Sequence, residues 1–219
     1  MWQTLDEAKV EALGCTRCRL SATRTQVVWL DGNPDSDLMF VGEAPGMNED
    51  KIGRPFVGAA GKLLDQLLDS IGLDRGKCVI CNVIKCRPPG NRNPEADEIA
   101  TCSPYLRAQI DFIKPTVIVT LGNFATRFIL ERQISITRAR GQIFRAFGAK
   151  VIPTFHPAAA LHSGGVTSPQ FALLRSDFKL VSSELAKGKR PPAPPPVAVA
   201  PVPAPVPVVE ALVQQDSLF

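Results

Sequence analysis

Short apolar runs alternate with longer amphipathic runs along the first 187 residues of the chain. Residues 38–41, 79–84 and 116–121 are short and mostly apolar, which is typical of buried strands. Residues 61–71 place leucine and isoleucine at helical spacing, which predicts a helix. Four further helices are predicted, in an N-terminal stretch before residue 15 and over residues 94–113, 122–131 and 170–186. Two more apolar runs, 142–147 and 151–155, predict a hairpin that turns at Gly148.

This order of elements predicts a central, mainly parallel sheet covered by helices on both faces, which is a three-layer α/β/α fold. In such sheets, ligands bind outside the carboxyl ends of the strands. The turn Gly42-Glu-Ala-Pro-Gly46 directly follows the first strand, with Glu43 at the strand tip. It lacks the Gly-Lys-Ser/Thr sequence of a phosphate-binding loop. We therefore expect a different kind of ligand site at this edge.

Three further side chains fall at the same edge. Phe56 lies in the loop Gly53-Arg-Pro-Phe-Val-Gly58; a core aromatic is the alternative, although such loops rarely bury their aromatics. Asn82 stands among apolar neighbours. It is either a structural amide or a residue that recognises the edge of a pyrimidine, since its side chain offers both a donor and an acceptor. His156 follows a predicted strand and is either structural or functional, whereas His162 lies among serine and glycine and is expected to be exposed.

Overall composition is ordinary for a soluble globular protein, with 45% hydrophobic and 21% charged residues. The formal net charge of +4 permits an anionic partner without requiring one. Local basic points suit phosphates, and a solvated basic face is an equally good interpretation of them; they are Arg87, Arg92, Arg138 and Arg140.

The composition changes abruptly near residue 188. Residues 191–209 consist almost wholly of proline, alanine and valine, so they can form neither a helix, a sheet ladder nor a membrane span. An extended, disordered tether is the expected state. The predicted organisation is one globular domain, a linker and a candidate docking peptide, over residues 1–187, 188–209 and 210–219.

Four cysteines are the strongest candidate for a metal site. Cys15 and Cys18 form a CxxC, while Cys86 and Cys102 lie far downstream on either side of a polar loop. Residues 1–10 carry neither a basic start nor an apolar run, so we expect no export signal, reduced thiols and a cytoplasmic protein. The unequal spacing favours an iron–sulfur cluster; zinc and unrelated buried thiols are the alternatives.

The other two cysteines have a simpler interpretation. Cys78 and Cys81 lie in or next to a predicted strand, where residues three apart point to opposite faces. They are therefore expected to be small buried hydrophobic residues that do not share a metal.

Several motifs occur together in a fixed order, and they are Gly42-Glu-Ala-Pro-Gly46, the loop from Gly53 to Gly58, Asn82-Val-Ile-Lys-Cys-Arg-Pro-Pro89, Leu121-Gly-Asn123 and His156-Pro-Ala-Ala-Ala-Leu161. Together they resemble the family 4 uracil-DNA glycosylases, the iron–sulfur type, over about residues 10–187. The resemblance implies one [4Fe–4S] cluster held by Cys15, Cys18, Cys86 and Cys102. It also implies phosphate contacts by arginines beside Cys86, which here are Arg87 and Arg92.

The implied reaction is hydrolysis of the bond between uracil and deoxyribose after the nucleotide is flipped out of the DNA. By resemblance, Phe56 stacks on uracil, Asn82 reads its O4/N3 edge and His156 donates a hydrogen bond to O2 of the leaving base. Backbone contacts come from the turn Gly42-Glu43-Ala44-Pro45. For positioning the water, Glu43 is our first choice and Glu49 our second.

Two departures from related families shape this expectation. Family 1 enzymes have an aspartate where this chain has Ala44, and a tyrosine where it has Gly46. A related branch traps the sugar through a histidine in an Arg-Arg-Ile-His stretch, which is missing here. We therefore expect turnover by a monofunctional enzyme without lyase activity.

The partners follow from the same resemblance. Uracil-containing DNA is the expected substrate, and the protein is expected to be a monomer that does not bind membranes. The ending Gln215-Asp-Ser-Leu-Phe219 resembles the peptide by which bacterial DNA-maintenance proteins bind the replication sliding clamp. A non-catalytic iron–sulfur module that binds nucleic acid and a redox carrier are the rival interpretations.

Overall fold

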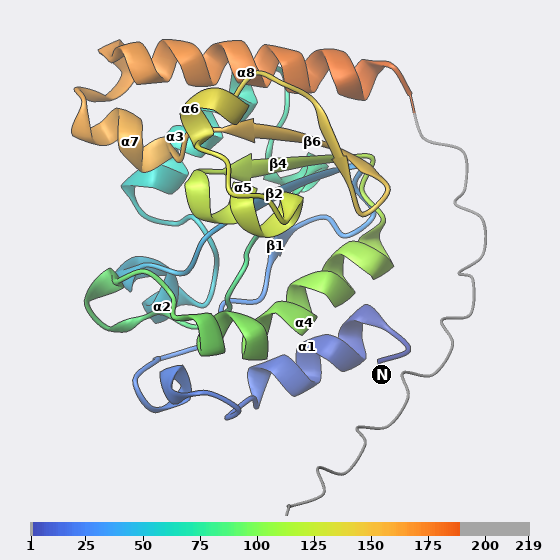
Figure 1. Cartoon of the computed structure of the whole chain (residues 1–219), viewed down its shortest axis with the longest axis vertical. Helices are drawn as coiled ribbons and strands as arrows, with labels where there is room; N and C mark the ends of the chain where they lie inside the picture. The colour runs from blue at the N-terminus through green and yellow to red at the C-terminus, as the bar shows by residue number, and fades with distance from the viewer. Residues whose placement is uncertain (1, 189–219) are drawn as a thin grey trace, which may run out of the picture.

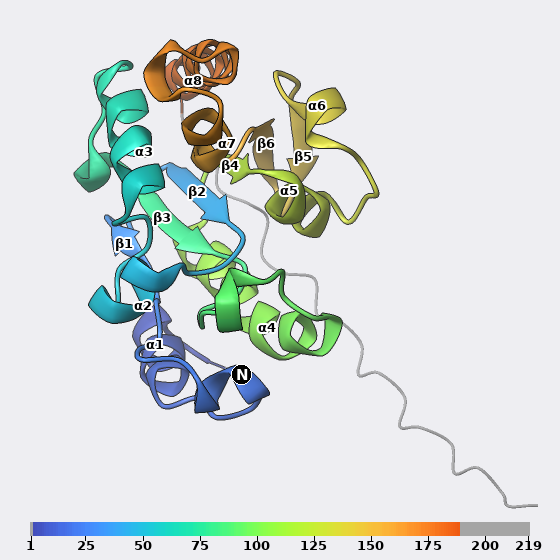
Figure 2. The ribbon, with the colours of Figure 1, turned by 90° about the vertical axis from the view of Figure 1, so that its left-hand side faces the viewer.

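The computed structural model describes residues 2–188, so the predicted linker and docking peptide lie outside the described residues. This part forms a central sheet with helices on both sides (Figures 1 and 2). The strands are β1 Asp31–Gly32, β2 Leu38–Gly42, β3 Val79–Asn82, β4 Val117–Leu121, β5 Phe144–Ala146 and β6 Ala149–Thr154. The α-helices are α1 Leu5–Leu13, α2 Met47–Ile52, α3 Ala59–Asp69, α4 Ala96–Ile113, α5 Asn123–Leu130, α6 Ile136–Ala139, α7 Pro157–His162 and α8 Pro169–Ala186.

The sheet has the strand order β1-β3-β2-β4-β6-β5. The four inner strands are parallel, whereas the edge strands β1 and β5 pair antiparallel with β3 and β6. The predicted α/β fold with a mainly parallel sheet is therefore confirmed. Because β2, β3, β4 and β6 run the same way, their carboxyl ends share one edge, and the segments that follow them can build one site.

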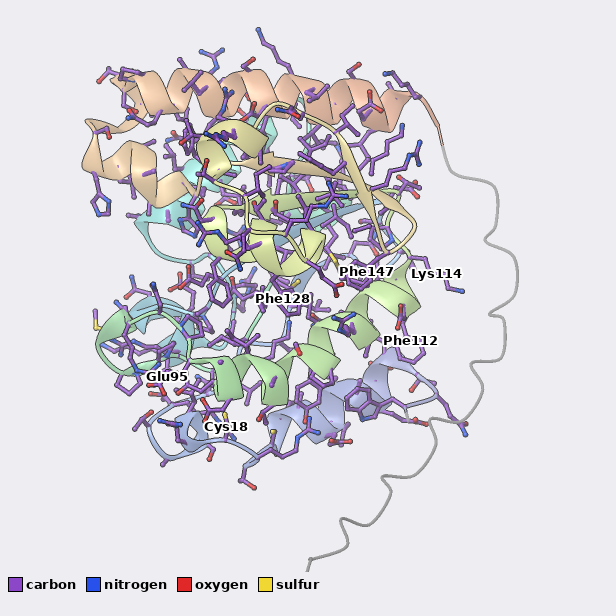
Figure 3. The ribbon with its side chains drawn as sticks, in the orientation of Figure 1. Cys18, Glu95, Phe112, Lys114, Phe128 and Phe147 are labelled. Carbon is purple, nitrogen blue, oxygen red and sulfur yellow. The ribbon has the colours of Figure 1, made fainter. Side chains whose placement is uncertain are left out.

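Each face of the sheet carries its own core because successive strand residues point to opposite sides. Helices α3, α7 and α8 cover one face, where the ring of Phe40 stacks on that of Phe178 at 5.5 Å between centroids. Helices α4 and α5 cover the other face, and α1 packs on α4. Arg107 of α4 lies over the rings of Phe128 and Phe147, at 5.9 and 5.4 Å from their centroids. The two phenylalanines are labelled in Figure 3.

The prediction that Cys78 and Cys81 are buried and point to opposite faces of the sheet is confirmed. Cys78 and Cys81 are fully buried, and each belongs to a different one of the two cores. No helix within residues 2–188 combines the length and the apolar character that crossing a bilayer requires.

Most predicted elements are present, with shifted ends. Helix α4 begins at Ala96 and not at Pro94, because the Glu98 carboxylate accepts the backbone N–H of Glu95 (2.8 Å) and starts the helix there. Strand β3 ends at Asn82, although the N–H groups of Val83 and Ile84 still donate to the carbonyls of residues 42 and 43. Helix α2 was not predicted from the sequence, since it is short and polar.

Candidate active site

A cavity of about 720 Å³ opens at the carboxyl ends of the inner strands. This volume is in the range of small-molecule sites, about 300–1,000 Å³. It is lined by predicted site residues together with neighbours from α2, α3, α7 and the 88–93 loop; the predicted residues are Glu43, Ala44, Pro45, Glu49, Phe56, Asn82, Arg92 and His156. The fold thus brings together side chains from widely separated segments.

Asn82 carries the most informative atom of the cavity. Its side chain is 2% exposed, and its Oδ1 has no hydrogen-bond partner among the described residues. An unpaired buried acceptor costs about 1–3 kcal/mol, so such an atom is expected to meet a donor from a ligand. Gly42 leaves the space in front of it: a Cβ there would overlap Oδ1 and lie 2.7 Å from Cζ of Phe56.

Phe56 is buried, with 6% of its surface exposed, contrary to our expectation for such a loop. Its ring stacks on the imidazole of His156, with centroids 5.5 Å apart and planes inclined by 28°. The backbone of Phe56 has φ +54°, which is uncommon for a bulky residue. The ring therefore belongs to the wall of the cavity, and an unusual backbone conformation holds it there.

His156 is held in one protonation form by its surroundings. It caps α7, and its Nδ1 accepts the backbone N–H of Ala158 at 3.2 Å. Burial lowers the pKa of His156 to about 4, although the charge of Glu49 acts in the opposite direction. At neutral pH the ring is therefore neutral, and because Nδ1 is an acceptor, the proton sits on Nε2, which can donate.

The two candidate carboxylates have different environments. Glu43 is half-buried, and burial raises its pKa. Glu49 instead uses both oxygens on the backbone: Oε1 accepts the N–H groups of Val57 and Gly58, both at 2.9 Å, and Oε2 accepts that of Gly46 at 3.2 Å. Glu43 is thus the carboxylate whose environment favours taking up a proton.

A second cavity of about 760 Å³ adjoins the first through Glu43 and His156. Its walls come from the ends of β4 and β6, from α5 and from Asn93. The two cavities have Glu43, Asn93 and His156 in common in their linings.

The four predicted phosphate-binding arginines fall into two pairs. Arg92 forms a bidentate ion pair with buried Glu98 (2.9 and 2.6 Å), and Arg140 forms one with buried Asp177 (3.1 and 2.6 Å). Arg138 is exposed, while Arg87 is half-buried and donates Nε to Asn91 (2.7 Å). Arg87 and Arg138 are the better placed pair for phosphates.

The four predicted cluster ligands gather beside the start of α4. Cys86 and Cys102 are 6% and 7% exposed, and Cys15 and Cys18 are half-buried; Figure 3 shows Cys18 next to the first turn of that helix. Burial raises the pKa of Cys86 to about 12, and the charges of Cys102 and Cys18 add to the effect. Burial also raises the pKa of Cys102, with contributions from Cys18 and Cys15.

These thiols suit a group that brings positive charge to several separate sulfurs. Two N–H groups already point at them: Lys85 N donates to Cys102 Sγ (3.2 Å) and Arg24 Nη1 to Cys86 Sγ (3.4 Å). Within residues 2–188, no three cysteine, histidine or acidic side chains are grouped closely enough to hold one metal ion. Thiolates are ligands of iron–sulfur clusters and of zinc, so the chemistry of the four donors fits the group predicted from the sequence.

A buried polar network behind Asn82 was not predicted from the sequence. Lys85 is 1% exposed and donates Nζ to the Asn82 carbonyl (2.7 Å) and to Gln109 Oε1 (2.6 Å). Gln109 in turn donates to the Trp29 carbonyl (3.1 Å). A lysine that directly follows an apolar strand was the available signal.

A family model and several relatives of high identity show to which family the chain belongs. Residues 30–179 match the model of the uracil DNA glycosylase superfamily. The chain is 47% identical to a type-4 uracil-DNA glycosylase of Sulfurisphaera tokodaii over 85% of this chain and 87% of that protein. It is 52% identical to one of Thermotoga maritima (68% and 79%) and 43% identical to one of Archaeoglobus fulgidus (86% and 96%).

Proposed function

The chain belongs to the type-4 uracil-DNA glycosylases of the uracil-DNA glycosylase superfamily, and from this premise we propose that it removes uracil from DNA by hydrolysing the N-glycosidic bond. The product is an abasic site in the DNA, together with free uracil. The observation that carries the proposal is the unpaired Oδ1 of Asn82, in one cavity with Phe56 and His156.

Uracil matches the Asn82 amide at both atoms. Its N3–H is the donor that the buried Oδ1 requires, and its O4 accepts from the amide nitrogen. Neutral cytosine has an acceptor at N3 and an amino donor at position 4, so both contacts would be unfavourable. A site built to pair with polar groups rejects an analogue that leaves them unpaired.

The base reaches this cavity only after it has left the stack. The turn from Gly42 to Pro45 then supplies backbone contacts, and Phe56 offers its ring to the base. Two backbone N–H groups, from Val83 and Ile84, hold this turn through the carbonyls of Gly42 (2.9 Å) and Glu43 (3.2 Å). The pocket is therefore preorganised before the base enters.

Departure of the base places negative charge on uracil and positive charge on the sugar. His156, neutral and protonated on Nε2, donates a hydrogen bond to O2 as that charge develops. A donor aimed at developing charge is typically worth about 3–4 kcal/mol.

Glu43 orients the water that attacks the sugar, and its carboxylate takes up the proton. Its raised pKa suits this role, since a base works best when its pKa approaches the working pH. Glu49 is the weaker candidate because both of its oxygens accept backbone N–H groups.

One [4Fe–4S] cluster would be held by Cys15, Cys18, Cys86 and Cys102. When bound, it supplies a structural cross-link between the N-terminal segment and the two segments that flank the 88–94 loop.

Arg87 and Arg138 contact DNA phosphates, and residues 215–219, outside the described part, dock on the replication sliding clamp. Deleting those five residues should abolish binding to the clamp and leave uracil excision unchanged.

The test is an alkaline-cleavage assay with cluster-loaded protein and an oligonucleotide that contains a single uracil. Matched oligonucleotides with cytosine or thymine at that position serve as controls. We expect strand scission at uracil alone. Binding of the uracil oligonucleotide without scission would refute the proposed enzymatic function and favour the rival interpretation, a non-catalytic module that binds nucleic acid.

A further inference from the structure

The loop that carries Phe56 is short and has an unusual backbone. It joins α2 to α3, and at Phe56 the chain adopts φ +54°, a conformation that bulky residues rarely take. Such a conformation persists only where the surroundings impose it. The side chains that impose it therefore determine where the Phe56 ring lies.

Arg75 contacts this loop from outside the cavity. It opens the short 3-10 helix Arg75–Lys77, and its guanidinium donates to the carbonyl of Pro55 at 3.1 Å and to that of Phe56. Arg75 lines neither of the two cavities at the sheet edge. It therefore acts on the backbone of Phe56 and not on a ligand.

Two carboxylates hold the guanidinium in that orientation. Asp31 of β1 accepts from Nη1 at 2.8 Å, and Asp65 of α3 accepts from Nε at 2.7 Å. The Arg75 side chain is 20% exposed, so these bonds are partly shielded from water. With Nε and both Nη atoms engaged, the planar guanidinium has one orientation, which a lysine ammonium could not reproduce.

The rest of the loop environment is complementary. Gly61 makes room for the Phe56 carbonyl, because a Cβ there would overlap that oxygen. On the opposite side, Glu49 accepts the N–H groups of Val57 and Gly58. The peptide groups on both sides of Phe56 are thus held by charged side chains, with Arg75 on the carbonyls and Glu49 on the amides.

We propose that Arg75 is a positioning residue that sets the Phe56 ring for recognition of the flipped base, an inference that rests on the proposed function. Arg75 lies outside the cavity walls, so its effect on the base is indirect. It links the edge strand and α3 to the base-binding wall through the backbone of one residue.

The experiment compares R75K with R54K in the full, cluster-loaded chain. Arg54 pairs with the same Asp31 (3.0 Å) but donates to neither loop carbonyl in the described structure, which makes R54K the matched control. Single-turnover excision of uracil from a single-stranded oligonucleotide is measured together with the Kd for that oligonucleotide. We expect the excision rate of R75K to fall about tenfold, which is less than the hundredfold that a misplacement of about 1 Å can cost. The Kd of R75K for the oligonucleotide should not change. The R54K control should keep the wild-type rate and Kd.

A double-mutant cycle with F56L separates positioning from general damage. If Arg75 acts through the Phe56 ring, R75K should change the rate of the F56L protein by less than about twofold, because coupled residues are not additive. An equal tenfold loss in both backgrounds would overturn the proposal, as would wild-type activity in R75K. An inactive wild type would instead refute the proposed function itself.

A second variant covers the case in which R75K fails to fold, judged by thermal unfolding. D65N removes the carboxylate charge that holds Nε while leaving the two loop carbonyls paired. We expect a loss of about threefold that also disappears in the F56L background, since the two residues share one network. A D65N protein with unchanged rate would overturn the proposal.

Discussion

Replacing His156 by alanine should slow uracil excision by roughly 10²–10³-fold at saturating DNA, because it removes one preorganised donor worth about 3–4 kcal/mol. This energy of about 3–4 kcal/mol is typical of an uncharged hydrogen-bond donor, which is the form that His156 takes here. In the structure, Nδ1 accepts the Ala158 N–H at 3.2 Å, so the neutral ring presents Nε2–H. His156→Gln keeps an N–H donor at similar reach and should lose less than the alanine variant.

The assay is single-turnover alkaline cleavage with cluster-loaded protein, so that product release does not mask the chemical step. Iron content and thermal unfolding of each variant serve as controls for folding. Equal rates for wild type and His156→Ala would refute the assignment of His156 to the leaving base. Equal losses for the alanine and glutamine variants would show that His156 does not act as a donor.

The pH dependence tests the protonation state. With a His156 pKa of about 4, the ring stays neutral from pH 8 down to about pH 5, so it adds no change in rate there. A required imidazolium would make the rate rise as pH falls through about 6.5. The rate should instead fall as pH drops through the raised pKa of Glu43, because protonation removes the base, and Glu43→Gln should abolish that limb.

Three further outcomes are expected. Gly42→Ala should fill the space before Asn82 Oδ1 and reduce uracil excision at least hundredfold, as measured in the same cleavage assay. Cys102→Ser should lower the iron bound per protein, measured by a colorimetric iron assay, whereas Cys78→Ser should leave it unchanged; equal loss in both would contradict the ligand assignment. Arg138→Gln should reduce the salt dependence of DNA binding by about one unit of slope in a titration from low to moderate salt, and an unchanged slope would remove Arg138 from the phosphate contacts.

The sheet could be predicted from the sequence because the local pattern of apolar and β-branched residues is enough to indicate its strands. The run at 116–121 is apolar and β-branched, and the leucines of 61–71 repeat at helical spacing. The edge that carries the site followed from the same reasoning, since glycine turns and polar residues come directly after the strands. Cys78 and Cys81 on opposite faces needed only the alternation of a strand.

The contacts that define the site could not be predicted, since each depends on distant partners. Arg140 and Asp177 are 37 positions apart, and only the fold shows that this arginine is engaged in a buried ion pair. Glu49 is separated from Val57 by one loop, yet nothing in the local sequence indicates that its carboxylate holds that loop. The burial of Phe56 was likewise set by tertiary packing, which overrides the preference of loop residues for solvent.

The order of strands in the sheet has a consequence during protein synthesis. β2 is central, but its neighbours β3 and β4 are made later, with Val117 following Leu38 by 79 residues. At about 5–20 residues per second, roughly 4–16 s separate the two on the ribosome. β3 can pair with one edge of β2 before then, but for that whole interval the other edge of this apolar strand lacks its partner β4 and is a template for pairing with other chains. The pace of translation between residues 42 and 117 therefore sets how long each new molecule is exposed to aggregation.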